Sequence, residues 1–290
     1  MEAFEHETVN VNGIDLHVVQ HGPKDGEVML FLHGFPEFWY GWHKQIDYFA
    51  AEGYRVWAPD QRGYNLSDKP EAVENYEMTH LVDDVVGLIK ASGKSKVILV
   101  GHDWGGIVAW RVAREYPELI EKMIILNAPH SGALKKQIAR HPGQLLKSSY
   151  ILFFQLQGIP EQFLLSSDGE NAAGALQMTS TPGAFSGQDL EAYRKAWAQP
   201  NAMRSMLNWY RANAKSMASS NLPKRVKVPT LILWGAKDQF LGKEMAVNSL
   251  DFCDDGRGIL LGEATHWLHH EEPEQINTLI GEFVDGHMDR

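Results

Sequence analysis

Short runs of β-branched and aliphatic residues alternate along this chain with longer segments in which apolar residues recur every three or four positions. The short runs predict buried strands, and the longer segments predict amphipathic helices. Predicted strands cover residues 8–12, 14–20, 28–32, 54–58, 96–100, 122–126, 230–234 and 258–261, and the clearest helices cover residues 78–90, 107–115 and 274–284. This alternation predicts an α/β fold whose eight-stranded sheet is mostly parallel and starts with an antiparallel hairpin turning at Asn12 and Gly13.

The strand pattern disappears between residues 134 and 229. Aromatic and Leu/Met-rich helical patterns replace it, and they are broken by Pro142, Pro160, Pro182, Pro200 and Pro223. An all-helical insertion after the sixth strand would lie over the carboxyl ends of the strands, where α/β sheets bind ligands. We therefore expect a core made of residues 1–133 and 229–290, with a helical cap of residues 134–228.

Composition and charge narrow the class of protein. The chain has 290 residues, 44% of them hydrophobic, which is enough for one large domain with a sizeable core. A net charge of -10 argues against nucleic acid or an anionic membrane as partner and leaves neutral, apolar substrates open. The single cysteine, Cys253, cannot form an internal disulfide, and neither a signal peptide pattern nor a long apolar run is present. We expect a cytoplasmic protein.

The hexapeptide GHDWGG at residues 101–106 is the strongest chemical signal. It follows a predicted strand and precedes a predicted helix, and Asp103 stands at the turn where G-x-S-x-G hydrolases carry serine. A carboxylate can attack a saturated carbon and form an alkyl ester, which water can then cut at the enzyme's own carbonyl. Asp103 is therefore a candidate nucleophile, and a helix N-cap is the alternative interpretation.

An acid and a base are expected at two later strand ends. Asp238 follows the strand that ends at residue 234, and His266 follows the last strand. Nucleophile, acid and histidine in this order are typical of α/β-hydrolases, in which the acid orients the imidazole that activates water. The end of the sixth strand offers Asn127, which cannot carry the charge. Taken singly, Asp238 and His266 would be ordinary surface residues, but their order at successive strand ends favours a triad.

The segment FLHGFP at residues 31–36 is the candidate oxyanion element. In this architecture the backbone N–H groups of Phe35 and Trp104 would face a carboxylate oxygen of Asp103 and stabilise the tetrahedral intermediate of ester hydrolysis. His33 and His102, which flank these elements, are interpreted as structural hydrogen-bonding residues.

Together these motifs resemble the soluble epoxide hydrolases of the α/β-hydrolase superfamily. The resemblance rests on HGFP at 33–36, DQRGYNLSDKP at 60–70, GHDWGG at 101–106, GAKD at 235–238 and the pair His266-Trp267, and it spans nearly the whole chain. It implies the α/β-hydrolase fold, with a mostly parallel eight-stranded sheet and an inserted all-helical cap domain. Several of these segments are shared with haloalkane and fluoroacetate dehalogenases, which also use an aspartate nucleophile.

The cap favours the epoxide hydrolases. The segments YILFFQ at 150–155 and NWYR at 208–211 resemble those that carry the two cap tyrosines of that family, so the resemblance implies Tyr150 and Tyr210 as proton donors. Opening an epoxide develops charge on an ether oxygen, and a phenol can bind and protonate it, whereas a departing halide needs no proton. The alternative is that both tyrosines are core residues of cap helices.

The predicted function is epoxide hydrolysis to a vicinal diol, without a cofactor and by a monomer or homodimer. Candidate substrate-binding residues are Phe35, Trp104, Phe153, Phe154 and Trp267, although packing within the cap would equally explain several of them. The histidines and glutamates at 266–272 have no recognised metal spacing, so no metal is expected. The alternative functions are a haloalkane or haloacid dehalogenase that uses Asp103 and a non-catalytic ligand-binding protein on the same fold.

Overall fold

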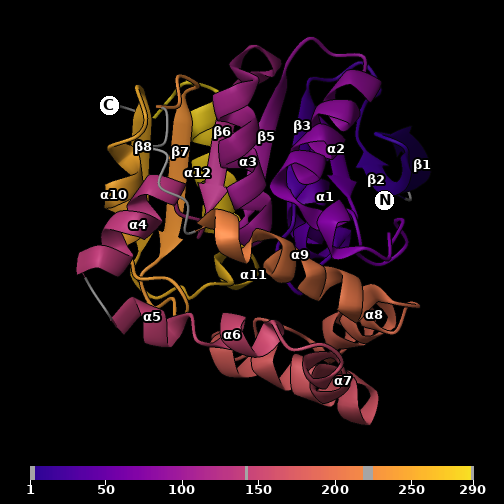
Figure 1. The fold of residues 1–290 in the computed structure, drawn as a ribbon. Helices are drawn as coiled ribbons and strands as arrows, with labels where there is room; N and C mark the ends of the chain where they lie inside the picture. The colour runs from indigo at the N-terminus through magenta and orange to yellow at the C-terminus, as the bar shows by residue number, and fades with distance from the viewer. Residues whose placement is uncertain (1–3, 141–142, 218–224, 289–290) are drawn as a thin grey trace.

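The computed structural model describes residues 4–140, 143–217 and 225–288. Its centre is one eight-stranded sheet with the strand order β1-β2-β4-β3-β5-β6-β7-β8 (Figure 1). The strands are β1 (Glu5–Val11), β2 (Ile14–His21), β3 (Val28–Leu32), β4 (Arg55–Pro59), β5 (Val97–His102), β6 (Ile120–Leu126), β7 (Thr230–Gly235) and β8 (Gly256–Leu261). Strand β2 pairs antiparallel with β1 and β4, and the other pairs are parallel. The predicted fold class is confirmed.

The first hairpin turns where the sequence predicted. Val11 pairs with Ile14, and both Asn12 and Gly13 have positive φ, at 50° and 75°. That pair of left-handed residues closes a tight two-residue hairpin and suits Asn-Gly. Strand β1 begins at Glu5, earlier than predicted, because an edge strand leaves one side to solvent and tolerates polar residues that hide its pattern.

Helices cover both faces of the sheet, and two apolar clusters fill the spaces between the layers. One face carries α1 (His43–Ala51), α11 (Leu268–Glu271) and α12 (Pro273–Val284). The other carries α2 (Met78–Ala91) and α3 (Asp103–Glu115), while α10 (Glu244–Leu250) packs beside β8. Short 3₁₀ helices span Trp39–Trp42, Val73–Tyr76 and Pro117–Leu119. None of the helices in the described residues is long and apolar enough to cross a membrane.

Only helices connect β6 to β7 in the described part of this segment. They are α4 (Ser131–Arg140), α5 (Gly143–Lys147), α6 (Tyr150–Phe154), α7 (Ile159–Thr179), α8 (Gly187–Trp197) and α9 (Ala202–Met217). Helix α4 packs against α10, whereas α6 to α9 form a separate layer at one end of the sheet (Figure 1). We call α6 to α9 the cap layer, and we propose residues 134–228 as the limits of the whole insertion.

The prolines of the insertion fall where helices begin or are joined. Pro160 lies in the first turn of α7, Pro182 lies between α7 and α8, and Pro200 lies between α8 and α9. Pro142 and Pro223 lie outside the described residues. A proline lacks the N–H that a helix interior needs, which explains these positions.

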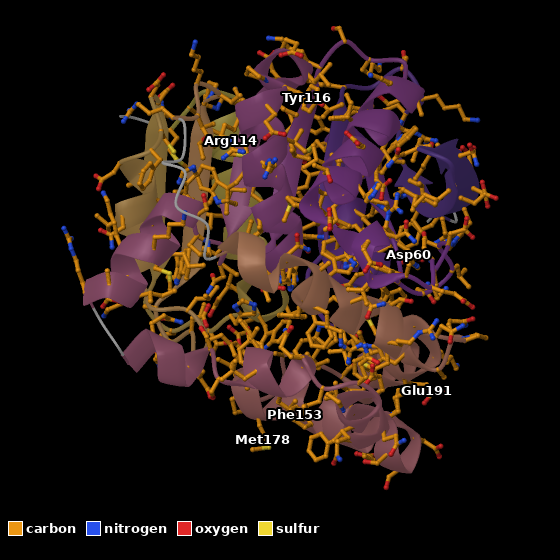
Figure 2. The ribbon with its side chains drawn as sticks, viewed as in Figure 1. Asp60, Arg114, Tyr116, Phe153, Met178 and Glu191 are labelled. Carbon is orange, nitrogen blue, oxygen red and sulfur yellow. The ribbon has the colours of Figure 1, made fainter. Side chains whose placement is uncertain are left out.

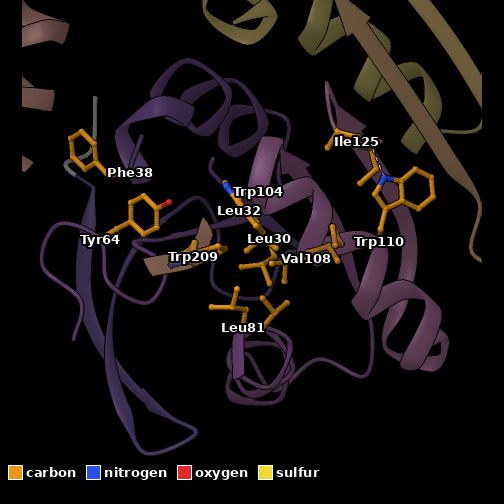
Figure 3. Close-up of a cluster of buried hydrophobic side chains, with 14 of the residues drawn as sticks. Leu30, Leu32, Phe38, Tyr64, Leu81, Trp104, Val108, Trp110, Ile125 and Trp209 are labelled. Atoms are coloured by element: carbon orange, nitrogen blue, oxygen red, sulfur yellow. Dashed lines mark hydrogen bonds between the residues drawn. The ribbon is translucent and has the colours of Figure 1, made fainter. Parts of the chain in front are cut away.

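Helix α9 fastens the cap layer to the core. Trp209 is 1% exposed, and its ring lies 5.8 Å from that of Trp104 and 5.5 Å from that of Tyr64, measured between centroids. Its indole N–H also donates to the backbone oxygen of Arg62 at 2.9 Å. Figure 3 shows Trp209 among the side chains of β3, α2 and α3. The next residue of α9, Tyr210, is thereby held at a defined place above the sheet.

Candidate active site

Asp103 lies at a strained turn between β5 and α3. Its φ is 49°, in the left-handed region that L-residues other than asparagine and aspartate rarely enter. Two glycines allow this turn: a Cβ on Gly105 would lie 2.2 Å from the Leu32 oxygen, and one on Gly101 would lie 2.6 Å from the Gly105 oxygen. Helix α3 therefore begins at Asp103, earlier than the predicted residue 107. The turn presents the Asp103 carboxylate at the carboxyl end of the sheet.

The structure brings Asp238 and His266 to the same end. His266 Nδ1 lies 2.8 Å from Asp238 Oδ2, and His266 Nε2 lies 3.6 Å from Asp103 Oδ2. The imidazole thus stands between two carboxylates, with one ring nitrogen facing each. This arrangement suits a general base that is oriented by one acid and works beside the other.

The electrostatics of the three groups are coupled. Burial disfavours the charged imidazole. The charge of Asp238, the hydrogen bonds to both carboxylates and the charge of Asp103 outweigh this effect and raise the pKa of His266 to about 10. Burial likewise opposes ionisation of Asp103, yet the hydrogen bond and charge of His266 hold its pKa below the usual value. The pKa of Asp238 is lowered in the same way. The resting site therefore contains an imidazolium between two carboxylates.

That imidazolium predicts a pH dependence of stability. Because the pKa of His266 is raised on folding, its stabilising contribution is fully present below about pH 6.5 and is lost as the pH rises toward 10. We expect the free energy of unfolding of the wild type, relative to that of His266→Gln, to fall between these pH values. Urea unfolding of both proteins measures this, and titrating groups that do not interact with His266 cancel in the difference. A constant difference would show that His266 is not held as a cation.

Asp238 is itself held by three donors. Asn127 Nδ2 lies 2.5 Å from Asp238 Oδ2, and the backbone N–H groups of Phe240 and Leu241 donate to Oδ1 at 2.7 and 2.9 Å. The Asn127 carbonyl oxygen accepts from the backbone of Gly235, which sets the direction of the amide. Asn127 cannot be the acid, as the sequence indicated, but it orients the acid. That contact joins two strand ends and leaves no local signal in the sequence.

The predicted oxyanion element is only half formed around the resting carboxylate. The Phe35 N–H donates to Asp103 Oδ1 at 3.0 Å. The loop comes this close because residue 34 is glycine, where a Cβ would lie 2.4 Å from that of Asp103. The Trp104 N–H makes no hydrogen bond to Asp103 among the described contacts. The His33 ring hydrogen-bonds to the Gly34 backbone oxygen and accepts from the Gln61 backbone N–H, and the Gln61 side chain donates to the His33 backbone oxygen.

Tyr150 and Tyr210 reach the same place from the cap layer. Their rings lie 6.1 Å apart, and the Tyr210 ring also lies 5.0 Å from that of Trp104. Burial and the charge of Asp103 raise the pKa of both phenols, although a hydrogen bond from Tyr210 partly offsets this for Tyr150. Both side chains therefore stay protonated and can donate at neutral pH.

One cavity of about 190 Å³ joins these groups. Asp103 and His266 line its floor, Tyr150 and Tyr210 line it from the cap layer, and the remaining wall is almost wholly apolar. That wall consists of Phe35, Pro36, Phe154, Leu164, Ala172, Ala175, Leu176, Thr179, Met203, Phe240 and Trp267. None of these described lining residues is a lysine or arginine. Such a cavity suits a neutral, apolar molecule.

Two of the predicted substrate-binding residues do not line this cavity, whereas Phe35, Phe154 and Trp267 do. Phe153 contacts Phe163 on the outside of the cap layer, because residues in a helix point about 100° apart and Phe154 takes the inward position (Figure 2). Trp104 is 2% exposed and points back into the core from the first turn of α3 (Figure 3). The cavity therefore gives no support to Phe153 and Trp104 as substrate contacts, and the substrate-binding role of the other three residues stays a prediction.

A buried polar cluster that the sequence did not indicate lies behind His266. Glu37 Oε1 lies 2.6 Å from His270 Nε2 and accepts from the Tyr193 hydroxyl at 2.7 Å, and Glu37 Oε2 lies 3.0 Å from His102 Nδ1. Among the described residues, Glu37, His269 and His270 form the group whose ligand atoms could surround a metal. Ligands around a tetrahedral zinc lie about 3.3 Å apart. The shorter contacts of Glu37 indicate a hydrogen-bonded network.

Comparisons with known proteins agree with this geometry. A family model described as the alpha/beta hydrolase fold matches residues 27–273. An AB hydrolase superfamily protein of Bacillus subtilis is 45% identical over 98% of this chain and 99% of its own length. Epoxide hydrolase 4 of Homo sapiens is 40% identical over 94% of this chain and 76% of its own length.

A solved structure extends the likeness to three dimensions. A mutant epoxide hydrolase from Bacillus megaterium, crystallised with its naphthyloxy-propane-1,2-diol product, matches with a TM-score of 0.89 and 31% identity. The match covers 96% of this chain and 100% of that chain. Both the sheet and the cap layer are therefore shared with that enzyme.

Proposed function

Because this chain belongs to the epoxide hydrolases of the α/β-hydrolase fold family, we propose that it converts neutral, apolar epoxides into vicinal diols through an ester of Asp103. The observation that carries this proposal is the placement of two phenols, the buried Tyr210 and the partly buried Tyr150, and one ionised carboxylate around the same apolar cavity. A carboxylate alone would suit several leaving groups. The phenols suit an oxygen that must be bound and protonated.

In the first step an Asp103 oxygen attacks one carbon of the epoxide ring. The carbon–oxygen bond of the ring breaks, and the ring oxygen takes a proton from Tyr150 or Tyr210. Their raised pKa values keep these phenols protonated until charge develops on the ring oxygen. The product of this step is a hydroxyalkyl ester of Asp103.

Formation of the ester prepares His266 for the second step. Alkylation removes the charge of Asp103, one of the two carboxylates that raise the pKa of His266. The imidazolium can then lose its proton, which restores the phenol that protonated the ring oxygen. A neutral His266 oriented by Asp238 becomes a general base only when there is an ester to hydrolyse.

In the second step His266 takes a proton from water, and the oxygen attacks the ester carbonyl of Asp103. The Phe35 N–H, which donates to Asp103 Oδ1 in the resting site, is placed to stabilise charge on that carbonyl oxygen. The tetrahedral intermediate collapses and the diol leaves with the proton from His266. The new carboxyl group then passes the second proton of the water to His266, which restores the Asp103 carboxylate and the imidazolium of the resting site. No metal or cofactor takes part in either step.

The cavity also argues against the dehalogenase alternatives. A haloacid carries a carboxylate, and the described lining residues include no lysine or arginine that could pair with it, while the imidazolium of His266 is already paired with Asp103 and Asp238. A haloalkane would fit, but it would make no use of the two phenol donors. Hydrolysis of epoxides uses both phenols together with Asp103 and His266.

The proposal is tested with a matched pair of epoxides. We expect hydrolysis of phenyl glycidyl ether and little turnover of its para-carboxylate analogue, because the apolar cavity would have to desolvate an unpaired charge. An expected ratio of kcat/KM of at least about 100 follows if that penalty is about 3 kcal/mol. Diol formation measured by chromatography checks both substrates. Failure to hydrolyse the neutral epoxide contradicts the proposed function, and equal turnover contradicts the substrate class.

We further propose that the enzyme works in the cytoplasm as a monomer or homodimer. Cys253 is buried and unpaired, and burial raises the pKa of its thiol to about 11. A thiol of this kind has no need of an oxidising compartment.

A further inference from the structure

Glu271 connects the segment that carries His266 to the cap layer. Its Oε2 accepts from the backbone N–H of Thr265 at 2.6 Å, and its Oε1 accepts from the Thr265 hydroxyl at 2.6 Å. The same Oε1 also accepts from the backbone N–H of Thr181 at 2.7 Å. Thr265 directly precedes His266, and Thr181 follows the end of α7. One carboxylate therefore holds both sides of the boundary between core and cap.

A second hydrogen bond crosses the same boundary on the other side of His266. The Trp267 indole N–H donates to Thr179 Oγ1 at 2.9 Å, and both residues line the cavity. His266 thus lies between two residues that are each tied, directly or through Glu271, to the end of α7. Movement of α7 away from the core would disturb both ties at once.

Glu271 rests on a fixed platform. It is the last residue of α11, whose backbone oxygens at His269 and His270 accept from Gln45 and Lys44 of α1 at 3.3 and 3.0 Å. Helix α1 packs on the sheet and on α12. A side chain anchored in this way can impose its position on the two segments that bind it.

We propose that Glu271 is a positioning residue that holds His266 and the wall of the cavity formed by α7 in one common geometry. This inference rests on the proposed function, in which His266 activates the water that hydrolyses the ester. The contacts require a carboxylate, because two backbone N–H groups face two different oxygens of Glu271. A glutamine can present only one acceptor oxygen, so its NH₂ group would face one of these donors.

The test is the substitution Glu271→Gln, compared with Glu272→Gln as a matched control. Glu272 is the next residue, loses the same charge, and makes no side-chain hydrogen bond among the described residues. In single-turnover experiments with phenyl glycidyl ether, we expect Glu271→Gln to slow hydrolysis of the Asp103 ester by on the order of 10-fold. We also expect KM to rise and the pH profile of the hydrolysis step to shift. Glu272→Gln should behave as the wild type.

Thr265→Val keeps the proposal testable if Glu271→Gln folds poorly. It conserves the shape of the side chain and removes the hydroxyl, which donates to Glu271 and accepts from the Trp267 backbone N–H at 3.3 Å. We expect it to slow ester hydrolysis in the same direction by a smaller factor, at a temperature where circular dichroism shows an intact fold. Wild-type rates in both variants would overturn the role of Glu271 while leaving epoxide hydrolysis intact. A wild type that opens no epoxide would overturn the proposed function instead.

Discussion

Replacing His266 with glutamine is expected to trap the protein as an ester of Asp103. The Asp103 carboxylate loses the charge of His266 but keeps the hydrogen bond from the Phe35 N–H, and in its ionised form it can still attack the epoxide, with solvent replacing the proton that His266 would have given up. Hydrolysis of the ester loses its general base and should slow by about 10² to 10⁴. Intact-protein mass spectrometry after mixing with phenyl glycidyl ether should show one added substrate mass, which peptide analysis should place on Asp103.

The control for this experiment is the double variant Asp103→Asn, His266→Gln. An amide is a poor nucleophile toward an epoxide, so we expect no added mass. His266→Gln that stays unmodified while the wild type turns over would refute the assignment of Asp103 or of His266. An adduct on another residue would refute Asp103 alone.

Removing both cap phenols is expected to abolish epoxide opening almost completely. Tyr150→Phe or Tyr210→Phe alone should slow alkylation by up to about 10² to 10⁴, less where the remaining phenol compensates, and the double variant should be slower still. A matched bromoalkane tests the cause, because a departing bromide takes no proton. Any alkylation by this compound should change far less than alkylation by the epoxide. Pre-steady-state measurement with both compounds separates proton donation from packing.

Tyr116→Phe is the matched control for these substitutions. Tyr116 follows the end of α3, at the opposite end of the sheet from the cap layer (Figure 2). We expect wild-type alkylation in this variant, and circular dichroism should show an intact fold in all of them. Epoxide opening at the wild-type rate in the double variant would make Tyr150 and Tyr210 packing residues. It would also move the dehalogenase interpretation to first place.

Local chemistry is the part of this protein that the sequence determines by itself. The β-branched runs predicted the strands to within a few residues, because a strand buried on both faces needs such side chains at every position. The glycines around Asp103 indicate the tight turn, because a residue with a side chain would not fit so close to the neighbouring backbone. The order of Asp103, Asp238 and His266 follows from the ends of parallel strands, which all meet at one edge of the sheet.

Only the tertiary structure decided which face of each cap helix points toward the cavity. Phe153 and Phe154 are adjacent and chemically identical, yet only Phe154 lines the cavity. Which of them points inward depends on how α6 packs against α9, and that packing cannot be predicted from the sequence of α6 alone. Trp104 is similar, because its place in the core depends on Trp209 of α9, more than a hundred residues away in the chain.

The residues that orient the site depended on long-range contacts in the same way. Asn127 donates to Asp238 across a separation of 111 residues, and Glu271 binds Thr181 across 90. An amide or a carboxylate at such positions looks like any polar loop residue until folding supplies its partner. The sequence therefore determined which groups are the catalytic candidates, because neighbouring residues specify the turns and strand ends that carry them. Only the tertiary structure decided what holds those groups in place, because their hydrogen-bond partners come from distant parts of the chain.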